Sequence, residues 1–389
     1  MLRQLILVIL LGTTCITFRG HTLRLTSVSA TPEFKQAADM HWLGRIEKER
    51  VAVCLAGAAR TFTDPLSIET IIAAFASFEG IGVDFYCWLT NDPRVGVERN
   101  SKNATYLSVA NGEVRAAATR LTRSSKYGSF ALNELNFQTS RTCNFGTHAE
   151  GPFDQSNESL LLRQTQPMFK REKCFESVVL AEQEIQKELG ANWQYRTIIS
   201  LRPDIFFFSE IRKELLLTKV PIFPAPAHGC SRWRNGHVIN DHLAFLPRGH
   251  AEQFFRMGKI HRTCVGNFSG SIAVCDRIRE LFENSDVDSS SVIPYNLNRR
   301  GSDTPYSNHD EGMCDRVRFF HQNLELSADA SSPWVQQCTR FTAWFLSGDA
   351  VRETSRSSQD VRSFWRQNTA ILSGEVKKSN MSSTENKFM

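Results

Sequence analysis

The residues best placed for chemistry are Arg202 and Asp204, which flank Pro203 directly after a short apolar run. That run, Thr197 to Leu201, is β-branched and apolar, which predicts a buried strand. The proline stops strand pairing at its end. Ligands of α/β proteins bind outside the carboxyl ends of the strands, so a cation and a carboxylate here suit a phosphate-bearing or metal-bridged ligand. A salt bridge at a strand end is the alternative interpretation.

A second candidate set follows an earlier predicted strand, Val51 to Ala56. Gly57 ends this strand, and its missing side chain would let backbone amides approach a phosphate. Arg60 would add positive charge to the same place. The alternative is a tight strand-to-helix turn with a solvent-facing arginine. The chain has no P-loop motif, and no Gly-x-Gly-x-x-Gly follows a strand.

A third polar set, Asn240-Asp241-His242, interrupts a predicted strand over Val238 to Leu246. Polar groups inside an apolar segment must be hydrogen-bonded or used in function. Asp241 is therefore a candidate base for an acceptor hydroxyl, or a group that positions it. A bulged edge strand, with Asp241 bonded to a loop, is the alternative.

The chain also contains a literal Asp-x-Asp, Asp286-Val287-Asp288, which is the metal-bridging signature of many sugar-nucleotide enzymes. Here it follows a predicted helix instead of ending a buried strand, so we expect a surface loop. Neither a Gly-x-Ser-x-Gly nor a Cys/His signature for a nucleophile is present.

The elements that must position these residues follow from the apolar pattern. Asp64 and Pro65 are the favoured cap and first residue of a helix, and Gly80 ends it. The next apolar run, Val83 to Leu89, predicts a second strand. Strand, helix and strand within about forty residues indicate a βαβ unit, and hence a parallel sheet with a right-handed crossover.

A further helix is predicted over Glu172 to Leu189, because its apolar residues fall on one face and a glycine follows. It leads into the strand at Thr197. This second βαβ-like connection brings Asp204 to the same edge of the sheet as Gly57 and Arg60. The fold class is therefore α/β, with a mostly parallel sheet flanked by helices.

The N-terminus predicts entry into the secretory pathway. An apolar run at residues 5–18 is shorter than the roughly 17–25 residues of a spanning helix and resembles a signal segment. No cleavage site follows at once, which favours an uncleaved signal anchor over a cleaved signal. We predict a stub at 1–4, an anchor at 5–18, a stem at 19–48, one luminal domain at 49–350 with an elaborated loop region at 91–165, and a partly disordered polar tail at 351–389.

Composition agrees with this compartment. Four glycosylation sequons occur, and nine cysteines lie outside the apolar run, which suits disulfides. Cys54 and Cys87 lie in predicted strands and are expected to be buried thiols, while Cys143/Cys174 and Cys230/Cys264 are plausible bridges. The net charge of +5 is scattered, so nucleic acid is not an expected partner.

Three segments carry a resemblance to a known family: residues 51–60, 201–206 and 240–244. Their order and spacing resemble those of eukaryotic glycosyltransferase-like proteins of the Golgi, which are type II membrane proteins with a GT-A-like nucleotide-sugar fold. The resemblance covers roughly residues 50 to 325. Glu311, within Asn-His-Asp-Glu, resembles a late acidic position of the family. This chain departs from the pattern at Ala58-Ala59 and His242, and Arg-Pro-Asp stands where metal-dependent GT-A enzymes have Asp-x-Asp.

The resemblance implies transfer of a sugar from a UDP- or GDP-sugar to a glycan or glycoprotein acceptor, with Mn²⁺ or Mg²⁺ as a potential cofactor. Gly57 and Arg60 would line the nucleotide site, and Arg202 would offset diphosphate charge. Asp204 would hold the metal or the donor ribose. Asp241 or Glu311 would orient or deprotonate the acceptor. The chain is expected at the Golgi or ER membrane with a luminal catalytic domain, or secreted.

Two alternatives stay open from the sequence. One is a catalytically inactive luminal carbohydrate-binding protein on the same fold. The other is a different Golgi transferase, such as a sulfotransferase, for which residues 57–61 would be a poor phosphosulfate loop.

Overall fold

The structure is a computed structural model. It describes residues 33–34, 49–59, 61–75, 78, 80–91, 109–133, 157–189, 192–223, 242–257, 278, 281–282, 285–288, 295–297, 333–347 and 356–368; at 33–34, 157–167, 296–297 and 333–335 only the backbone is described. The chain divides into two units, residues 1–31 and 32–389, and every described residue belongs to the second.

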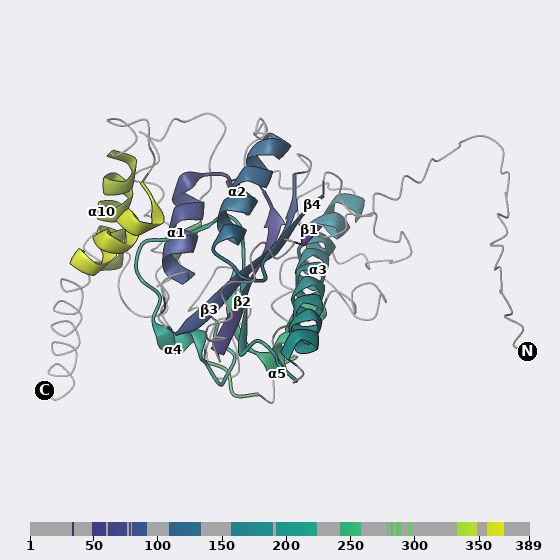
Figure 1. The fold of residues 1–389 in the computed structure, drawn as a ribbon. Helices are drawn as coiled ribbons and strands as arrows, with labels where there is room; N and C mark the ends of the chain where they lie inside the picture. The colour runs from purple at the N-terminus through teal and green to yellow at the C-terminus, as the bar shows by residue number, and fades with distance from the viewer. Residues whose placement is uncertain are drawn as a thin grey trace, which may run out of the picture. The chain divides into compact units, whose positions relative to one another are not determined.

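A mostly parallel sheet forms the centre of this unit (Figure 1). Its strand order is β1-β4-β3-β2-β5-β7, with β4, β3, β2 and β5 parallel and β1 and β7 antiparallel at the two ends. The strands are β1 (Glu33–Phe34), β2 (Glu49–Ala58), β3 (Ile81–Thr90), β4 (Ser129–Asn133), β5 (Thr197–Leu201) and β7 (Leu243–Pro247); β6 (Ile205–Phe207) and β8 (Tyr295–Leu297) pair separately. The predicted α/β class and the first parallel βαβ unit are confirmed.

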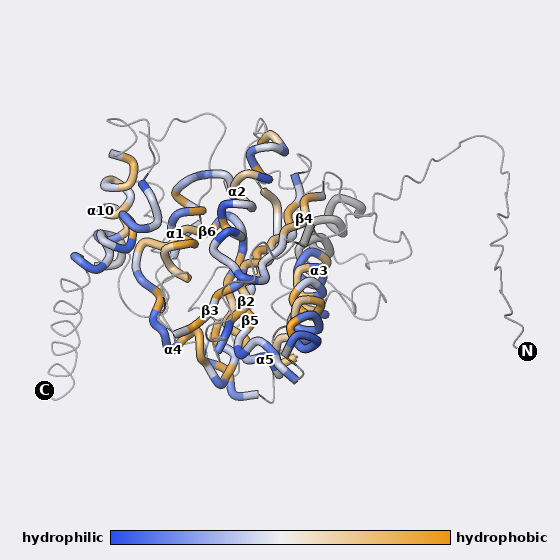
Figure 2. The backbone as a smooth tube through the Cα atoms, in the orientation of Figure 1, coloured by the Kyte–Doolittle hydropathy of each residue, from blue (hydrophilic) through white to orange (hydrophobic). Residues whose placement is uncertain are grey.

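Helices cover both faces of the sheet, because successive side chains of a strand point to opposite faces. In β2, Val51, Val53 and Leu55 pack into one apolar cluster with α1 and α2, while the residues between them pack into a second cluster with α3 and α5. Figure 2 shows mainly hydrophobic strands at the centre and a mixture of hydrophilic and hydrophobic residues along α2 and α3. The helices are α1 (Pro65–Phe75), α2 (Asn111–Arg123), α3 (Asn157–Leu189), α4 (Lys213–Leu216), α5 (Arg248–Phe255) and α10 (Pro333–Ser347).

Two parts of the chain differ from the sequence prediction. The predicted loop region at 91–165 contains α2 and β4, and α3 begins at Asn157 instead of Glu172. Helix α2 was missed because it buries few apolar side chains, namely Val114, Ala118 and Leu121, so its periodicity is weak. The cap of α1 is as predicted, since Leu66 N donates to Asp64 Oδ1 at 3.0 Å.

The cysteine pairing also differs from the prediction. Cys54 in β2 forms a disulfide with Cys174 in α3, with 5.9 Å between their Cα atoms. Both residues are fully buried, so the bond fastens the helix to the middle of the central strand. The predicted free thiol at Cys54 and the predicted Cys143/Cys174 bridge are therefore wrong. Cys87 is free and buried, as expected.

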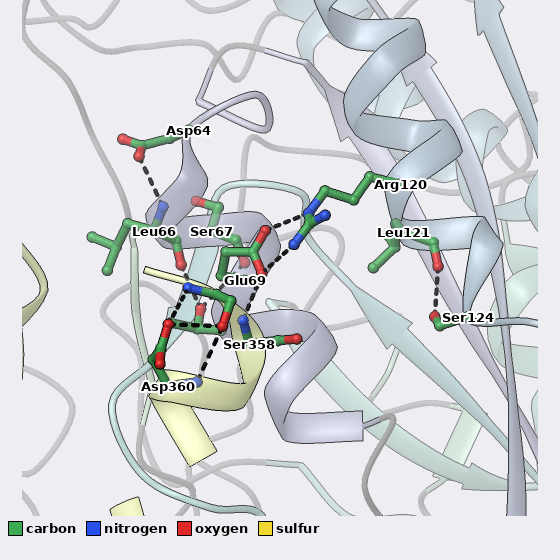
Figure 3. Close-up of polar contacts among 11 residues, drawn as sticks. Asp64, Leu66, Ser67, Glu69, Arg120, Leu121, Ser124, Ser358 and Asp360 are labelled. Carbon is green, nitrogen blue, oxygen red and sulfur yellow. Dashed lines mark hydrogen bonds and ion pairs between the residues drawn. The ribbon is translucent and has the colours of Figure 1, made fainter. Parts of the chain in front are cut away.

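A C-terminal helix at 358–368 lies within the stretch predicted to be a polar tail, and it packs against α10. Trp344 and Phe364 stack with ring centroids 4.4 Å apart. Glu69 of α1 accepts hydrogen bonds from Arg120 of α2 and, at 2.7 Å, from Ser358 N at the start of this helix (Figure 3). These contacts give the helix an apolar and a polar attachment to the α1 side of the sheet.

No helix among the described residues is both long enough and apolar enough to cross a membrane. The segment predicted as a signal anchor, residues 5–18, lies outside the described residues.

The amino end of the sheet is held by a buried carboxylate, Asp84 of β3. Arg50 of β2 donates to both of its oxygens at 2.8 Å. Lys126 N and Tyr127 N, just before β4, donate to Oδ1, and the Tyr195 hydroxyl, just before β5, donates to Oδ2 at 2.9 Å. Asp84 thus links the starts of four strands. Sequence reasoning did not identify it.

We predict that Asp84→Ala lowers the free energy of unfolding by about 3–5 kcal/mol, because it leaves the Arg50 guanidinium buried without its carboxylate. Urea denaturation followed by circular dichroism measures this loss. Glu184→Ala is the matched control: its ion pair with Lys187 is exposed, so the change should stay within about 0.5 kcal/mol. Equal effects of the two variants would contradict the role given to Asp84.

Stability should also fall above pH 10. Burial, with the charge of Asp84, raises the pKa values of Tyr86 and Tyr195 well above 10.0. In this window the unfolded chain loses phenolic protons that the folded chain keeps, so stability decreases with rising pH by up to about 1.4 kcal/mol per unit for each tyrosine. Denaturation at stepped alkaline pH measures the slope, and the double variant Tyr86→Phe/Tyr195→Phe should flatten it. An unchanged slope in that variant would contradict this assignment.

Candidate ligand site at the carboxyl edge of the sheet

The strand order creates a switch point between β2 and β5. From β2 the chain continues to β3 and β4 on one side, and then crosses to β5 on the other. The connections at the carboxyl ends of β2 and β5 therefore lead away in opposite directions. In open α/β sheets this is where ligands bind.

Gly57 and Pro203 meet at this switch point. A side chain on Gly57 would place its Cβ 2.7 Å from Pro203 Cδ and 3.0 Å from Cγ. The structure thus confirms that Arg202-Pro203-Asp204 lies at the same edge as Gly57. It also explains why a glycine stands at position 57, because a side chain there would overlap the Pro203 ring.

Arg202 and Asp204 form a bidentate ion pair at the same edge. Arg202 Nε donates to Asp204 Oδ1 at 2.8 Å, and its terminal nitrogen donates to Oδ2 at 2.6 Å. The arginine side chain is 30% exposed and the aspartate 10%. The pair is therefore open to solvent on the arginine side, and its two charges offset each other.

The same pair bears on the predicted metal site. Both oxygens of Asp204 accept from a guanidinium, so a divalent cation there would have to share the carboxylate with Arg202 or displace it. Among the residues that the structure describes, no group of three His, Cys, Asp or Glu side chains could hold a metal. The metal role of Asp204 stays a prediction.

The start of β7 lies at the same edge as the end of β5, because the two strands are antiparallel. Arg202 N donates to the carbonyl oxygen of His242 at 3.0 Å. Three predicted site residues, Arg60, Asp241 and Glu311, lie outside the described residues.

Thr90, at the carboxyl end of β3, is a feature that sequence reasoning missed. Its side chain is buried, and no group in the described part of the chain hydrogen-bonds its hydroxyl. Its carbonyl accepts from Ala59 N at 2.9 Å, which ties the residue to the segment after β2. The only sequence signal was its position at the end of an apolar run.

The Asp-x-Asp at 286–288 lies away from the switch-point strand ends. The backbone of Asp288 pairs with the segment around Ile222, since Asp288 N donates to Pro221 O at 2.9 Å, and Asp286 is exposed. This agrees with the expected surface loop.

The strand order and the polar edge define the described part of the chain as a doubly wound α/β domain with its candidate ligand site at the switch point. No family model matches the chain, and no curated protein matches it. Among solved structures, an active-site mutant of LgtC aligns with a TM-score of 0.32 and 12% identity over 62% of this chain and 72% of that one. The glycosyltransferase GlyE of Streptococcus pneumoniae TIGR4 aligns at 0.36 and 8% identity, over 83% of this chain and 64% of GlyE.

The mannosyltransferase PcManGT of Pyrobaculum calidifontis, in complex with GDP-Man and Mn²⁺, aligns with a TM-score of 0.28 and 8% identity, over 83% of this chain and 80% of that one. Similarities at these levels carry no argument about function.

We predict that Gly57→Ala destabilises the protein by about 1–3 kcal/mol, because the new methyl group would overlap the Pro203 ring. Gly112→Ala is the control, since a Cβ there meets nothing within 4 Å. The double variant Gly57→Ala/Pro203→Ala should recover part of the loss, as residues in contact are energetically coupled. Urea denaturation of the three variants tests the contact. An unchanged free energy of unfolding in Gly57→Ala would argue against it.

Proposed function

We propose that the protein is a glycosyltransferase that moves a sugar from a nucleoside diphosphate donor, UDP- or GDP-linked, to a glycan or glycoprotein acceptor. The observation that carries this proposal is the convergence of Gly57 and Arg202-Pro203-Asp204 at the switch point of the sheet. These are the segments that resemble the Golgi-type family. The position of this edge favours a bound ligand, and the family-like motifs that meet there favour a nucleotide sugar as that ligand.

In this proposal the donor lies across the carboxyl ends of β2 and β5. Arg202 would turn from Asp204 toward the diphosphate and stabilise the negative charge of the leaving group. Asp204 would then accept hydrogen bonds from the donor ribose. The acceptor hydroxyl would attack the anomeric carbon, the bond to the diphosphate oxygen would break, and Asp241 or Glu311 would receive the hydroxyl proton.

We place this activity in the secretory pathway. The apolar segment at 5–18 and the sequons motivate that placement, and the Cys54–Cys174 disulfide supports it because disulfides persist in oxidising compartments. Attachment to the membrane through residues 5–18 belongs to the same proposal.

One observation favours a second candidate, a carbohydrate-binding protein without transferase activity. The Arg202–Asp204 pair is closed, so in this state both side chains that would handle the diphosphate are occupied by each other. A protein that only binds glycans would have no need to open it.

Calorimetric titration of the full chain with UDP and GDP, with and without Mn²⁺, tests the donor site. We expect saturable binding of one nucleotide. Asp204→Asn should weaken it at least tenfold, because the variant has no carboxylate for the ribose or a metal. Asp286→Asn, on an exposed aspartate, is the control and should bind as the wild type does.

The outcomes separate the two candidates. Binding followed by release of free sugar from the matching nucleotide sugar supports a transferase. Absence of binding to any nucleotide by the folded wild-type chain would sink the transferase proposal, and binding of glycans alone would then favour the second candidate.

A further inference from the structure

The outer side of α2 carries a group of exposed cations that the proposed function has not used. Helix α2 packs Val114, Ala118 and Leu121 into the apolar cluster on the sheet, so its opposite side faces solvent. That side and the turn after it hold four exposed basic residues, which form the basic face of α2: Arg115, Arg120, Arg123 and Lys126.

The basic face is positively charged because α2 contains few acidic residues. The helix has one carboxylate, Glu113, against three arginines. Glu69 of α1 pairs with Arg120, whose side chain is still 53% exposed (Figure 3). On α3, by contrast, the exposed Lys187 pairs with Glu184 at 2.7 Å, so the two charges offset each other. A positive surface of this kind attracts anions.

The side chains of α2 favour a polar polyanion over a lipid surface as the partner. Helices that lie on membranes insert an apolar face with Trp, Phe or Leu into the lipid. The two large apolar residues of α2, Val114 and Leu121, are buried in the core instead. Between the cations, Gly112 and Ala116 are small and exposed, so a ligand can approach the helix closely. Arginine binds carboxylates and similar oxyanions through two parallel hydrogen bonds.

The start of α2 lies at the carboxyl edge of the sheet, where the proposed donor binds. Asn91 directly follows β3, and its amide donates to Asn111 Oδ1 at 2.7 Å. Strand β3 pairs in parallel with β2, so their carboxyl ends meet at this edge. Along the helix axis, Arg115 is about 6 Å and Arg123 about 18 Å from Asn111. The basic face therefore begins near the carboxyl edge and extends away from it.

We infer that the acceptor is a polyanionic glycan, with carboxylate or sulfate groups, that binds along the basic face of α2 with its reacting end at the carboxyl edge. This inference rests on the proposed function and names the class of acceptor. Arg115 and Arg123 are about 12 Å apart along the helix axis. They would therefore contact separate anionic groups of one glycan chain, so a polymer should bind better than a single sugar.

Calorimetric titration of the full chain with dextran sulfate, polygalacturonate and neutral dextran tests this inference. We expect binding of at least one charged polymer and not of dextran, and weaker binding at high salt, because exposed charges are screened. Arg115→Gln/Arg123→Gln should weaken binding about tenfold. The matched control, Lys187→Gln/Arg256→Gln, removes the same charge from exposed residues of α3 and the end of α5, on the other face of the sheet, and should bind as the wild type does.

A single variant and a mapping experiment keep the inference testable if the double variant does not fold. Arg123→Gln changes one exposed side chain and should weaken polymer binding about threefold. In the wild-type chain, hydrogen exchange of peptides covering residues 111–126 should slow when the charged polymer is added. Unchanged affinity in folded Arg123→Gln together with protection only in other peptides would overturn the inference.

Other partners and the failure of the proposed function give different results. Binding of anionic phospholipid vesicles or polyaspartate through this face, with neither charged glycan bound, would overturn the inference in favour of a membrane or an acidic protein. If the wild-type chain binds a nucleotide but no charged glycan, the inference fails and the donor site survives. If it binds a charged glycan through α2 but no nucleotide, the transferase proposal and the acceptor role fail, and a glycan-binding protein remains.

Discussion

The buried bond between Arg50 and Asp84 is the constraint on which the arrangement of the sheet depends. Asp84 is fully buried and carries a charge that must be matched, so the groups around it can lie in few positions. It accepts from β2 and from the segments that precede β4 and β5. With the amino ends of these strands fixed in this way, their parallel pairing sets where the carboxyl ends emerge. The close approach of Gly57 to Pro203 at the other edge follows from that pairing.

Helix α3 connects the two edges of the sheet. Glu182 fastens it at the amino edge, and the Cys54–Cys174 disulfide fastens it to the middle of β2. A helix held at two points has little freedom to slide or rotate.

The sequence was sufficient for the features that depend on local pattern. The apolar runs of β2, β3 and β5, the Asp64 cap and the shared edge of Gly57 and Asp204 all follow from composition, turn residues and the handedness of the crossover. Features that depend on pairing between distant segments could not be predicted. Cys54 and Cys174 are separated by 120 residues, and nothing local links them. The first half of α3 was missed as well, since the helix begins at Asn157 instead of the predicted Glu172.

Two bidentate arginine–aspartate pairs with the same chemistry occur among the described residues, and their exposure decides how easily each can open. In the Arg50–Asp84 pair the side chains are 7% and 0% exposed, so opening it would separate two buried charges where water cannot replace the lost ion pair. In the Arg202–Asp204 pair they are 30% and 10% exposed. Water can replace part of what this pair loses when it opens, so its net contribution to stability is small. In the proposed function, a diphosphate, which carries more negative charge than a carboxylate, would compete for Arg202 and so free Asp204 for the donor. The pair at the amino edge is thus fixed by its burial, while the pair at the carboxyl edge can open at a smaller cost in stability, as the proposed donor site requires.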